Sequence, residues 1–307
     1  MDAQWCVRYL HYDVFTDTPY EGNQLAVVPQ PVTGISTAKM QQIAQEMNFS
    51  ETTFVFPKEA GGDVRMRIFT PGNELPMAGH PTIGTTYALA HEGVIARGRT
   101  SFVFECGVGP IPVELEWDDR GLAFVWMTQG QPAFGVEIAD RAGFAAAVGL
   151  DPADMLDLPI QEISCGVPFF FVPIRTRAAV DRVSIDPRSL ARVAKEAGRD
   201  LPIFFFTTDR TGATGNETVY SRMLAPGFGI AEDPATGSAS GPLGSYLLRY
   251  GLVDGAQARG MVSLQGFAMK RPSRIHIAID GTPGGITGVR VGGQAVLVGR
   301  GELMTER

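Results

Sequence analysis

Two parts of the chain, about half its length apart, carry the same succession of residues. In the first, Arg67-Ile68-Phe69-Thr70-Pro71 is followed by Ala78-Gly79-His80-Pro81 and then by an apolar stretch. In the second, Arg222-Met223-Leu224-Ala225-Pro226 is followed by Ala235-Thr236-Gly237-Ser238 and another apolar stretch. A repeat of this length is typical of a duplicated domain and not of a solenoid, whose repeats span about 20–50 residues. The sequence therefore predicts two similar domains.

The segments next to each copy also match in their local patterns. Residues 36–47 and residues 187–198 place apolar side chains at i, i+3, i+4 and i+7, the spacing of an amphipathic helix. A β-like run follows each of them, at 48–56 and 202–207. Many strands, few helices and no regular βαβ alternation predict an α+β fold. Further strands are expected at 7–15, 24–29, 64–69, 101–105, 110–117, 121–127, 167–174, 218–224, 261–265, 273–279 and 286–299.

The apolar stretches at 81–91 and 240–250 are expected to form the central helix of each domain. They have almost no charge on any face, and a helix of that kind is buried on all sides. We therefore expect a sheet wrapped around one helix in each half. The predicted N-terminal domain is 1–127 and the C-terminal domain is 128–307, with the final strand able to cross to the first domain. Segment 128–135 reads as the linker.

Composition excludes several classes of function. A formal charge of −7 and a pI near 5.2 argue against nucleic-acid binding, which needs clustered Lys and Arg. The apolar runs are too short for a membrane helix, so we expect a cytoplasmic protein. Cys6, Cys106 and Cys165 show no C-x-x-C spacing and the histidines form no H-x-x-x-H pair, so no metal site is predicted. Segments 281–285 and 292–294 are expected to be hairpin turns and not phosphate loops, because no helix follows them.

Glu51 is the first candidate for chemistry, because it opens an otherwise apolar β-like run. A carboxylate that is screened from water can serve as a general base at neutral pH. The alternative is an exposed glutamate at a strand start, which is the commoner situation for this residue type.

His80 and Asp233 are further candidates, because they occupy the equivalent turns of the two halves. Each has a plain structural alternative: His80 as a capping or core histidine, and Asp233 as part of an Asp-Pro turn before a helix. Turns that open helices present unpaired N–H groups and the positive end of the helix dipole. If two such turns face one cleft, they would hold an anionic small molecule.

Several short motifs spread along the chain occur together. They lie at 13–16 with 22–27, at 48–52, at 74–82, at 232–239 and at 292–296. In combination they resemble the phenazine-biosynthesis PhzF-like family, whose relatives include diaminopimelate epimerase.

The resemblance implies two pseudo-symmetric diaminopimelate epimerase-like domains, each a curled mixed sheet around a central helix. It also implies a homodimer and chemistry without a cofactor. Glu51 matches the acid/base of the family, and His80, Asp233 and Ser238 match positions in its substrate site. Ser50, Gly79 and Gly237 are assigned to substrate binding together with Ser238.

The epimerase relatives carry a cysteine just before each helix-opening turn, so that two thiols act on opposite faces of one carbon. By motif, the corresponding positions in this sequence are Ala78 and Ala235, which cannot take a proton. The second half also offers Leu201 or Pro202 in place of Glu51. With Glu51 as the single base, a proton would be removed from one face of the substrate and returned to the same face. Inversion of one carbon would need a second base on the opposite face.

The sequence therefore predicts an isomerase that moves a proton within a small, cyclic amino or hydroxy carboxylic acid. Glu51, His80 and Asp233 are the predicted catalytic residues: Glu51 would move the proton, and His80 and Asp233 would orient polar groups and pass or hold protons. The turn amides would bind the carboxylate. A racemase, epimerase or dehydratase of another such acid is the alternative among enzymes. A catalytically idle binding protein is the alternative outside them. The sequence does not identify the substrate.

Overall fold

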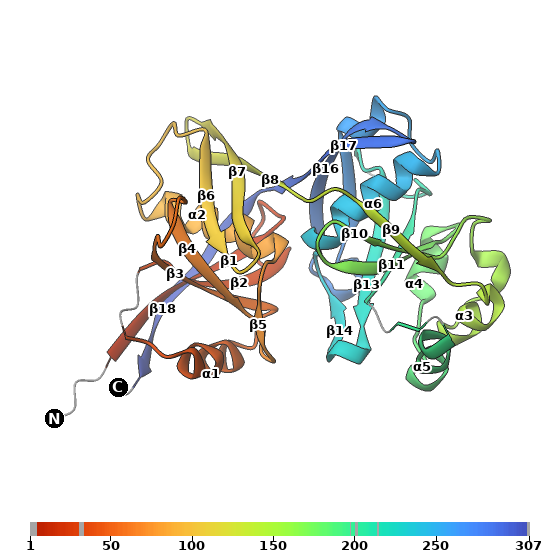
Figure 1. Cartoon of the computed structure of the whole chain (residues 1–307), viewed down its shortest axis with the longest axis horizontal. Helices are drawn as coiled ribbons and strands as arrows, with labels where there is room; N and C mark the ends of the chain where they lie inside the picture. The colour runs from red at the N-terminus through yellow and green to blue at the C-terminus, as the bar shows by residue number, and fades with distance from the viewer. Residues whose placement is uncertain (1–4, 31–33, 197, 200–201, 214, 306–307) are drawn as a thin grey trace. The chain divides into compact units, whose positions relative to one another are not determined.

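The computed structural model describes residues 5–30, 34–196, 198–199, 202–213 and 215–305 (Figure 1). Its backbone divides into two compact units. One comprises the described residues up to Thr128 together with those from Gly292 onward, and the other runs from Gln129 to Val291. Residue 197, within a predicted helix, and Leu201 lie outside the described residues.

In the first unit, strands surround helix α2 (Gly79–His91), which contacts β1, β2, β3, β8 and β18 (Figure 1). β2 pairs in parallel with β3, β1 pairs antiparallel with β2 and β18, and β3 pairs antiparallel with β4. β4 pairs in parallel with β6, and β6, β7 and β8 follow antiparallel. The strands are β1 (Trp5–Val14), β2 (Asn23–Val28), β3 (Glu51–Pro57), β4 (Val64–Phe69), β5 (Glu74–Leu75), β6 (Ser101–Cys106), β7 (Gly109–Asp118), β8 (Gly121–Thr128) and β18 (Ala295–Thr305).

Helix α2 is buried because its residues are small or apolar on every side, as the sequence predicted. At Gly84, a Cβ atom would lie 2.5 Å from Leu25 Cδ2, so the glycine allows β2 to pack closely against α2. Adjacent residues of β3 face opposite layers. Thr53 places its hydroxyl 2.8 Å from that of Thr85 in α2, whereas Phe54 packs with α1 (Thr37–Met47). The unit therefore has a helix on each face of β3.

The second unit repeats this strand succession around α6 (Gly237–Arg249). β10–β11 is antiparallel, β11–β12 parallel, β12–β13 antiparallel, β13–β15 parallel and β15–β16 antiparallel. The strands are β9 (Ala133–Glu137), β10 (Gln161–Ser164), β11 (Pro168–Pro173), β12 (Ile203–Thr207), β13 (Val219–Ala225), β14 (Ile230–Asp233), β15 (Met261–Gln265), β16 (Ser273–Thr282) and β17 (Gly285–Gly293). The other α-helices are α3 (Arg141–Ala147), α4 (Arg177–Arg182) and α5 (Pro187–Glu196).

The two runs of three phenylalanines are explained by burial on both faces of the second sheet. Phe170 and Phe205 belong to the core that includes residues of α3 and α4. Phe171 and Phe204 face the opposite side, in the core that contains Tyr246 of α6. Strands buried on both faces read as continuous apolar runs, so alternation is lost from the sequence.

The predicted central helices are confirmed, although each begins earlier than expected, at Gly79 and Gly237. The predicted linker at 128–135 is wrong in its last part, because β9 begins at Ala133 and pairs with β10. β9 is mostly exposed, so its sequence has no apolar alternation. The short strands β10 and β14 and the helices α3 and α4 were not predicted either, because they are too short to show a clear period.

The two glycine-rich C-terminal segments differ from each other. The hairpin turn expected at 281–285 is confirmed, since β16 ends at Thr282 and β17 begins at Gly285. The one expected at 292–294 is wrong, because the chain stays extended through Gly293 and resumes as β18 at Ala295. A Cβ at Gly293 would lie 2.5 Å from the Phe15 ring, so this glycine serves close packing.

We predict that Gly22→Ala destabilises the protein more than Gly93→Ala. Both glycines are left-handed, with φ of 68° and 74°, so each substitution strains the backbone by about 1 kcal/mol or more. At Gly22 the new Cβ would also lie 2.4 Å from the Val14 carbonyl oxygen, whereas no heavy atom lies within 4 Å at Gly93. The clash should add about 1–3 kcal/mol to the loss in unfolding free energy, measured in urea. Equal losses would contradict this account.

Candidate active site

Glu51 and His80 meet inside the first unit. Glu51 is the first residue of β3 and His80 is the second residue of α2, and the helix packs against that strand. His80 Nε2 lies 3.3 Å from Glu51 Oε2, and the two side chains are 5% and 15% exposed. The structure therefore brings together the two predicted site residues of this unit, with the carboxylate screened from most of the solvent.

Burial determines the charge state of His80. Removal from water lowers its pKa to about 3, and a backbone hydrogen bond with Gln24 opposes this only in part. The imidazole is therefore neutral at pH 7, with one nitrogen that donates and one that accepts. Such a ring can share a proton with Glu51 without itself carrying a charge.

Asn23 is a residue of this cluster that sequence reasoning did not assign to the site. Its side chain is fully buried, and its Nδ2 lies 3.4 Å from His80 Nδ1. Asn23 is the first residue of β2 and follows Gly22, whose φ is 68°. Asn23 could have been found from the sequence, because it is a polar residue between a glycine and an apolar strand.

Asp233 lies in the second unit, at the end of β14 and just before α6. It is 8% exposed. Thr236 Oγ1 donates to Asp233 Oδ2 over 2.5 Å, and Gln265 Nε2 donates to the Asp233 carbonyl oxygen over 2.8 Å. Sequence reasoning did not assign Thr236 to the site although it lies in the same motif, and it missed Gln265 because that residue comes from β15, far along the chain.

The predicted substrate-binding residues lie at the starts of the two helices and of β3. Gly79 and Gly237 are buried and are the first residues of α2 and α6. Ser238 is half-buried in the first turn of α6, and Ser50 is half-buried immediately before β3. In neither helix does the N-cap side chain accept a hydrogen bond from the first turn. Such amides suit an anion.

The two helix starts define one equivalence between the units. The N-cap residues are Ala78 in α2 and Thr236 in α6, and in each case a hydroxyl four residues later donates to the N-cap carbonyl. By helix start, Thr236 and not Ala235 is the counterpart of Ala78 within this chain, whereas the match of Ala78 and Ala235 to the cysteine positions of the epimerase relatives stays a prediction. None of these three residues carries a thiol, so the contrast with two-cysteine chemistry remains.

Strand pairing also identifies the residue that corresponds to Glu51. In each unit the arginine of the repeat, Arg67 or Arg222, pairs with a phenylalanine in the preceding strand. Three residues before that phenylalanine, the first unit has Glu51 and the second has Pro202. Of the two candidates named from the sequence, Pro202 is the match, and it cannot exchange a proton.

The same two arginines form equivalent ion pairs. Arg67 donates from Nε and Nη2 to Glu74 over 2.7 and 2.6 Å, and Arg222 donates from the same atoms to Glu232 over 3.0 and 2.8 Å. Bidentate pairs of this kind hold two strands in a defined geometry. The pairs join β4 to β5 and β13 to β14.

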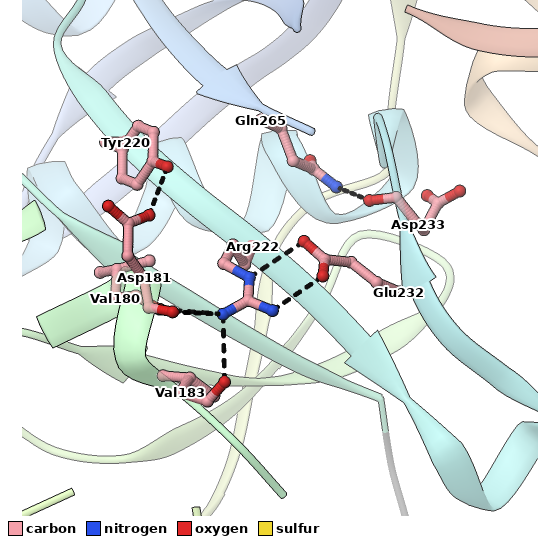
Figure 2. Close-up of polar contacts among 8 residues, drawn as sticks. All are labelled: Val180, Asp181, Val183, Tyr220, Arg222, Glu232, Asp233 and Gln265. Atoms are coloured by element: carbon pink, nitrogen blue, oxygen red, sulfur yellow. Dashed lines mark hydrogen bonds and ion pairs between the residues drawn. The ribbon is translucent and has the colours of Figure 1, made fainter. Parts of the chain in front are cut away.

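Arg222 has a further set of acceptors (Figure 2). Its Nη1 donates over 3.1–3.2 Å to three main-chain carbonyl oxygens at the end of α4, those of Val180, Asp181 and Val183. Figure 2 shows the Glu232 side chain directed toward Arg222 and the carboxylate of Asp233 directed away from it. The ion pair therefore holds the strand from which Asp233 projects.

The described residues give no sign of a metal site or a membrane helix. Within those ranges, no group of three or more His, Cys, Asp or Glu side chains is placed to hold a metal ion. No helix in the described part of the chain is long and apolar enough to cross a membrane.

Comparison with known proteins determines the family. The model of the family described as phenazine biosynthesis-like protein matches residues 12–301. The chain belongs to the phenazine-biosynthesis PhzF-like family. The resemblance seen in the sequence is thereby confirmed, over nearly the whole chain.

Named relatives show that this PhzF-like chain is an isomerase. It is 35% identical over 298 residues to trans-2,3-dihydro-3-hydroxyanthranilate isomerase from Pseudomonas fluorescens, covering 97% of this chain and 99% of the relative. It is 34% identical over 303 residues to an uncharacterized isomerase of Mesorhizobium japonicum, covering 96% and 98%. The family acts on small molecules.

Solved structures confirm the predicted α+β fold class. A phenazine biosynthesis protein of the PhzF family from Bacillus anthracis has a TM-score of 0.86 at 28% identity, covering 98% of this chain and 100% of that one. A hydroxyproline epimerase from Agrobacterium vitis has a TM-score of 0.68 at 13% identity, covering 100% and 95%. The second likeness shows a shared fold alone.

We predict that Arg222→Met destabilises the protein more than Arg67→Met. Loss of Arg222 leaves the largely buried Glu232 carboxylate without its guanidinium partner and removes one donor from each of three carbonyls, which should cost about 3–5 kcal/mol. The Glu74 side chain is 38% exposed, so water can replace Arg67 at a lower cost. Unfolding free energies from urea titrations of both variants give the comparison. A larger loss in Arg67→Met would refute this ranking.

We also predict that His80→Asn reduces the acid sensitivity of the fold. His80 has a pKa of about 3 when folded, against about 6.5 in an unfolded chain. As pH falls from about 6.5 toward 3, the unfolded chain binds a proton that the folded chain does not, so stability is lost over that window. Asparagine does not titrate. Melting temperatures between pH 7 and 4 should therefore fall less steeply in the variant, and parallel curves would exclude this contribution.

Proposed function

We propose that this PhzF-like chain is a cofactor-independent isomerase in which Glu51 moves a proton within a small cyclic amino or hydroxy carboxylic acid. The observation that carries the proposal is the buried contact between Glu51 and the neutral His80. A carboxylate in that setting has a partner that can hold or pass a proton and is shielded from competing water.

The proposed proton transfer conserves atoms and electrons. A C–H bond of the substrate breaks, its proton goes to a Glu51 carboxylate oxygen, and its electron pair moves into the adjacent unsaturated system. Glu51 then returns the proton to a second carbon on the same face, where the electron pair forms the new C–H bond. The substrate is neither oxidised nor reduced, so the reaction needs no redox partner.

His80 and Asp233 are proposed to orient polar groups of the substrate, with help from Ser50 and Ser238. The first-turn N–H groups of α2 and α6, which include those of Gly79 and Gly237, are proposed to bind its carboxylate. Preorganised donors of this kind stabilise charge that develops during proton transfer. We infer a homodimer from the family resemblance and keep the cytoplasmic location as an expectation from the sequence.

The proposed substrate class follows from the named relatives. The Pseudomonas fluorescens relative is a trans-2,3-dihydro-3-hydroxyanthranilate isomerase and is 35% identical over 97% of this chain. We therefore propose a partly unsaturated ring that carries a carboxylate and an amino or hydroxyl group. Unsaturation next to the C–H bond delocalises the electron pair that is left when the proton is removed, which lowers the barrier to its removal.

Epimerisation by two opposed bases is disfavoured by the residues at the equivalent positions. Pro202 occupies the position of Glu51, and Ala78 and Thr236 occupy the two N-caps. None of these three is a general base. A catalytically idle binding protein is disfavoured because its relatives are named as isomerases.

We predict that Glu51→Gln loses deuterium exchange and turnover while it remains folded. In heavy water with a dihydro-hydroxyanthranilate substrate, the wild-type protein should form isomerised product, with deuterium at the receiving carbon in those turnovers in which Glu51 exchanges its proton with solvent before returning it. Removal of a general base costs about 10²–10⁴ in rate, and the amide keeps the shape of the side chain.

The matched control is Glu46→Gln, which removes an exposed carboxylate from α1 and should leave the rate unchanged. If the Glu51→Gln variant incorporates deuterium and turns over substrate at the wild-type rate, Glu51 is not the base. Exchange of the α-proton of an amino acid with loss of optical activity, and without double-bond migration, would identify an epimerase instead.

A further inference from the structure

Asp233 is bound through its carboxylate by Thr236 and through its main-chain carbonyl by Gln265. Gln265 is fully buried at the end of β15. Its Nε2 donates to the Asp233 carbonyl oxygen over 2.8 Å and to Thr236 Oγ1 over 2.9 Å. Its Oε1 accepts from the Thr236 backbone N–H over 3.1 Å. Figure 2 shows Gln265 reaching the Asp233 main chain.

The orientation of the Gln265 amide is determined by these partners. A flipped amide would place its oxygen against the Asp233 carbonyl and its nitrogen against the Thr236 N–H, so both contacts would be lost. The amide nitrogen must therefore face Thr236 Oγ1 as a donor. The hydroxyl accepts that bond and has its own hydrogen left to donate.

The Thr236 hydroxyl hydrogen is consequently directed at Asp233. The distance between Oγ1 and Asp233 Oδ2 is 2.5 Å, the range of a hydroxyl that donates to an ionised carboxylate. A chain of donors thus runs from Gln265 through Thr236 to Asp233. It restricts rotation of the carboxylate.

Comparison of the two helix starts shows that this hydroxyl is not needed to begin the helix. The N-cap of α2 is Ala78, which has no hydroxyl, and yet α2 has the same length as α6. The Thr236 side chain makes no capping bond to its own helix. The position that corresponds to Asp233 in β5 is Leu75, since both lie opposite the second residue of the repeat motif. The hydroxyl therefore occurs in the unit that has the carboxylate.

The backbone around this chain of donors is also adapted to close contact. Gly266 follows Gln265 with φ of 81°, and a Cβ there would lie 2.6 Å from the Pro234 carbonyl oxygen. Ser273 Oγ donates to that same carbonyl over 2.9 Å. The end of β15 is thus locked against the turn that carries Asp233.

We propose that Thr236 and Gln265 are positioning residues that fix the orientation of the Asp233 carboxylate for catalysis. Thr236 acts directly on the carboxylate, and Gln265 acts by directing the Thr236 hydroxyl. The inference rests on the proposed function, in which Asp233 orients a polar group of the substrate.

The test compares Thr236→Val, which keeps the shape and removes the hydroxyl, with Thr236→Ser, which retains it. Thr236→Val should lower kcat about 10–100-fold, the usual effect of a misplaced catalytic group, while KM changes little. Thr236→Ser should stay close to wild type. The control is Ser245→Ala on the same helix, which removes a buried hydroxyl that donates to the Gly241 carbonyl oxygen. That variant should keep the wild-type kcat.

Asp233→Asn separates this inference from the proposed function. If Asp233→Asn keeps the wild-type kcat, Asp233 has no catalytic role and the proposed function loses that residue. If Asp233→Asn is impaired and Thr236→Val is not, the positioning role alone is wrong. In the double variant Asp233→Asn/Thr236→Val, kcat should equal that of Asp233→Asn alone, because the Thr236 hydroxyl then has no carboxylate to position.

A general structural effect would give a different result. Equal losses of kcat in Thr236→Val and Ser245→Ala would overturn the proposal, since the second hydroxyl lies away from Asp233. If Thr236→Val does not fold, Thr236→Ala takes its place, because alanine is the N-cap of the equivalent helix α2. Wild-type kcat in folded Thr236→Ala, together with an impaired Asp233→Asn, would overturn the proposal as well.

Discussion

The burial of a whole helix inside each sheet is the constraint on which the rest of this structure depends. A helix with strands around it has no solvent face, so charge is excluded and small residues are needed where strands approach. Gly84 in α2 and Gly244 in α6 meet this need; at Gly244 a Cβ would lie 2.6 Å from Ile277 Cγ2. The start of each helix then lies beside the strand that precedes it, which is where His80 and Asp233 are found.

Within this shared framework the two units have diverged at the positions that carry chemistry. The arginine–glutamate pairs that join neighbouring strands are kept in both units. Glu51 corresponds to Pro202, and Asp233 corresponds to Leu75. A duplication that keeps its strand-to-strand pairs and changes its acid/base groups preserves the architecture while making the chemistry one-sided. That asymmetry supports a proton shift over a two-base inversion.

Sequence patterns predicted the long, strongly patterned elements and missed the short ones. The central helices were predictable because nearly all of their positions are buried, which excludes charged residues from both sequences. β9 and β14 were not, because an exposed edge strand and a four-residue strand carry no clear period. Of the candidate site, Glu51, His80 and Asp233 were named from their motifs, whereas Asn23 and Thr236 lie within the same motifs without having been assigned to the site, and Gln265 lies outside them.

The sequence by itself determined the family, the α+β class, the duplication and the three acidic or basic side chains on which the proposal rests. It did so because these depend on local composition and on motifs within single segments. Tertiary structure decided which residues touch: the 3.3 Å contact of Glu51 with His80, and the contacts of Gln265 with Thr236 and Asp233. It also decided that Thr236, and not Ala235, matches Ala78. Such equivalences depend on strand register and helix start, and a shift of one residue in either leaves the composition of the chain unchanged.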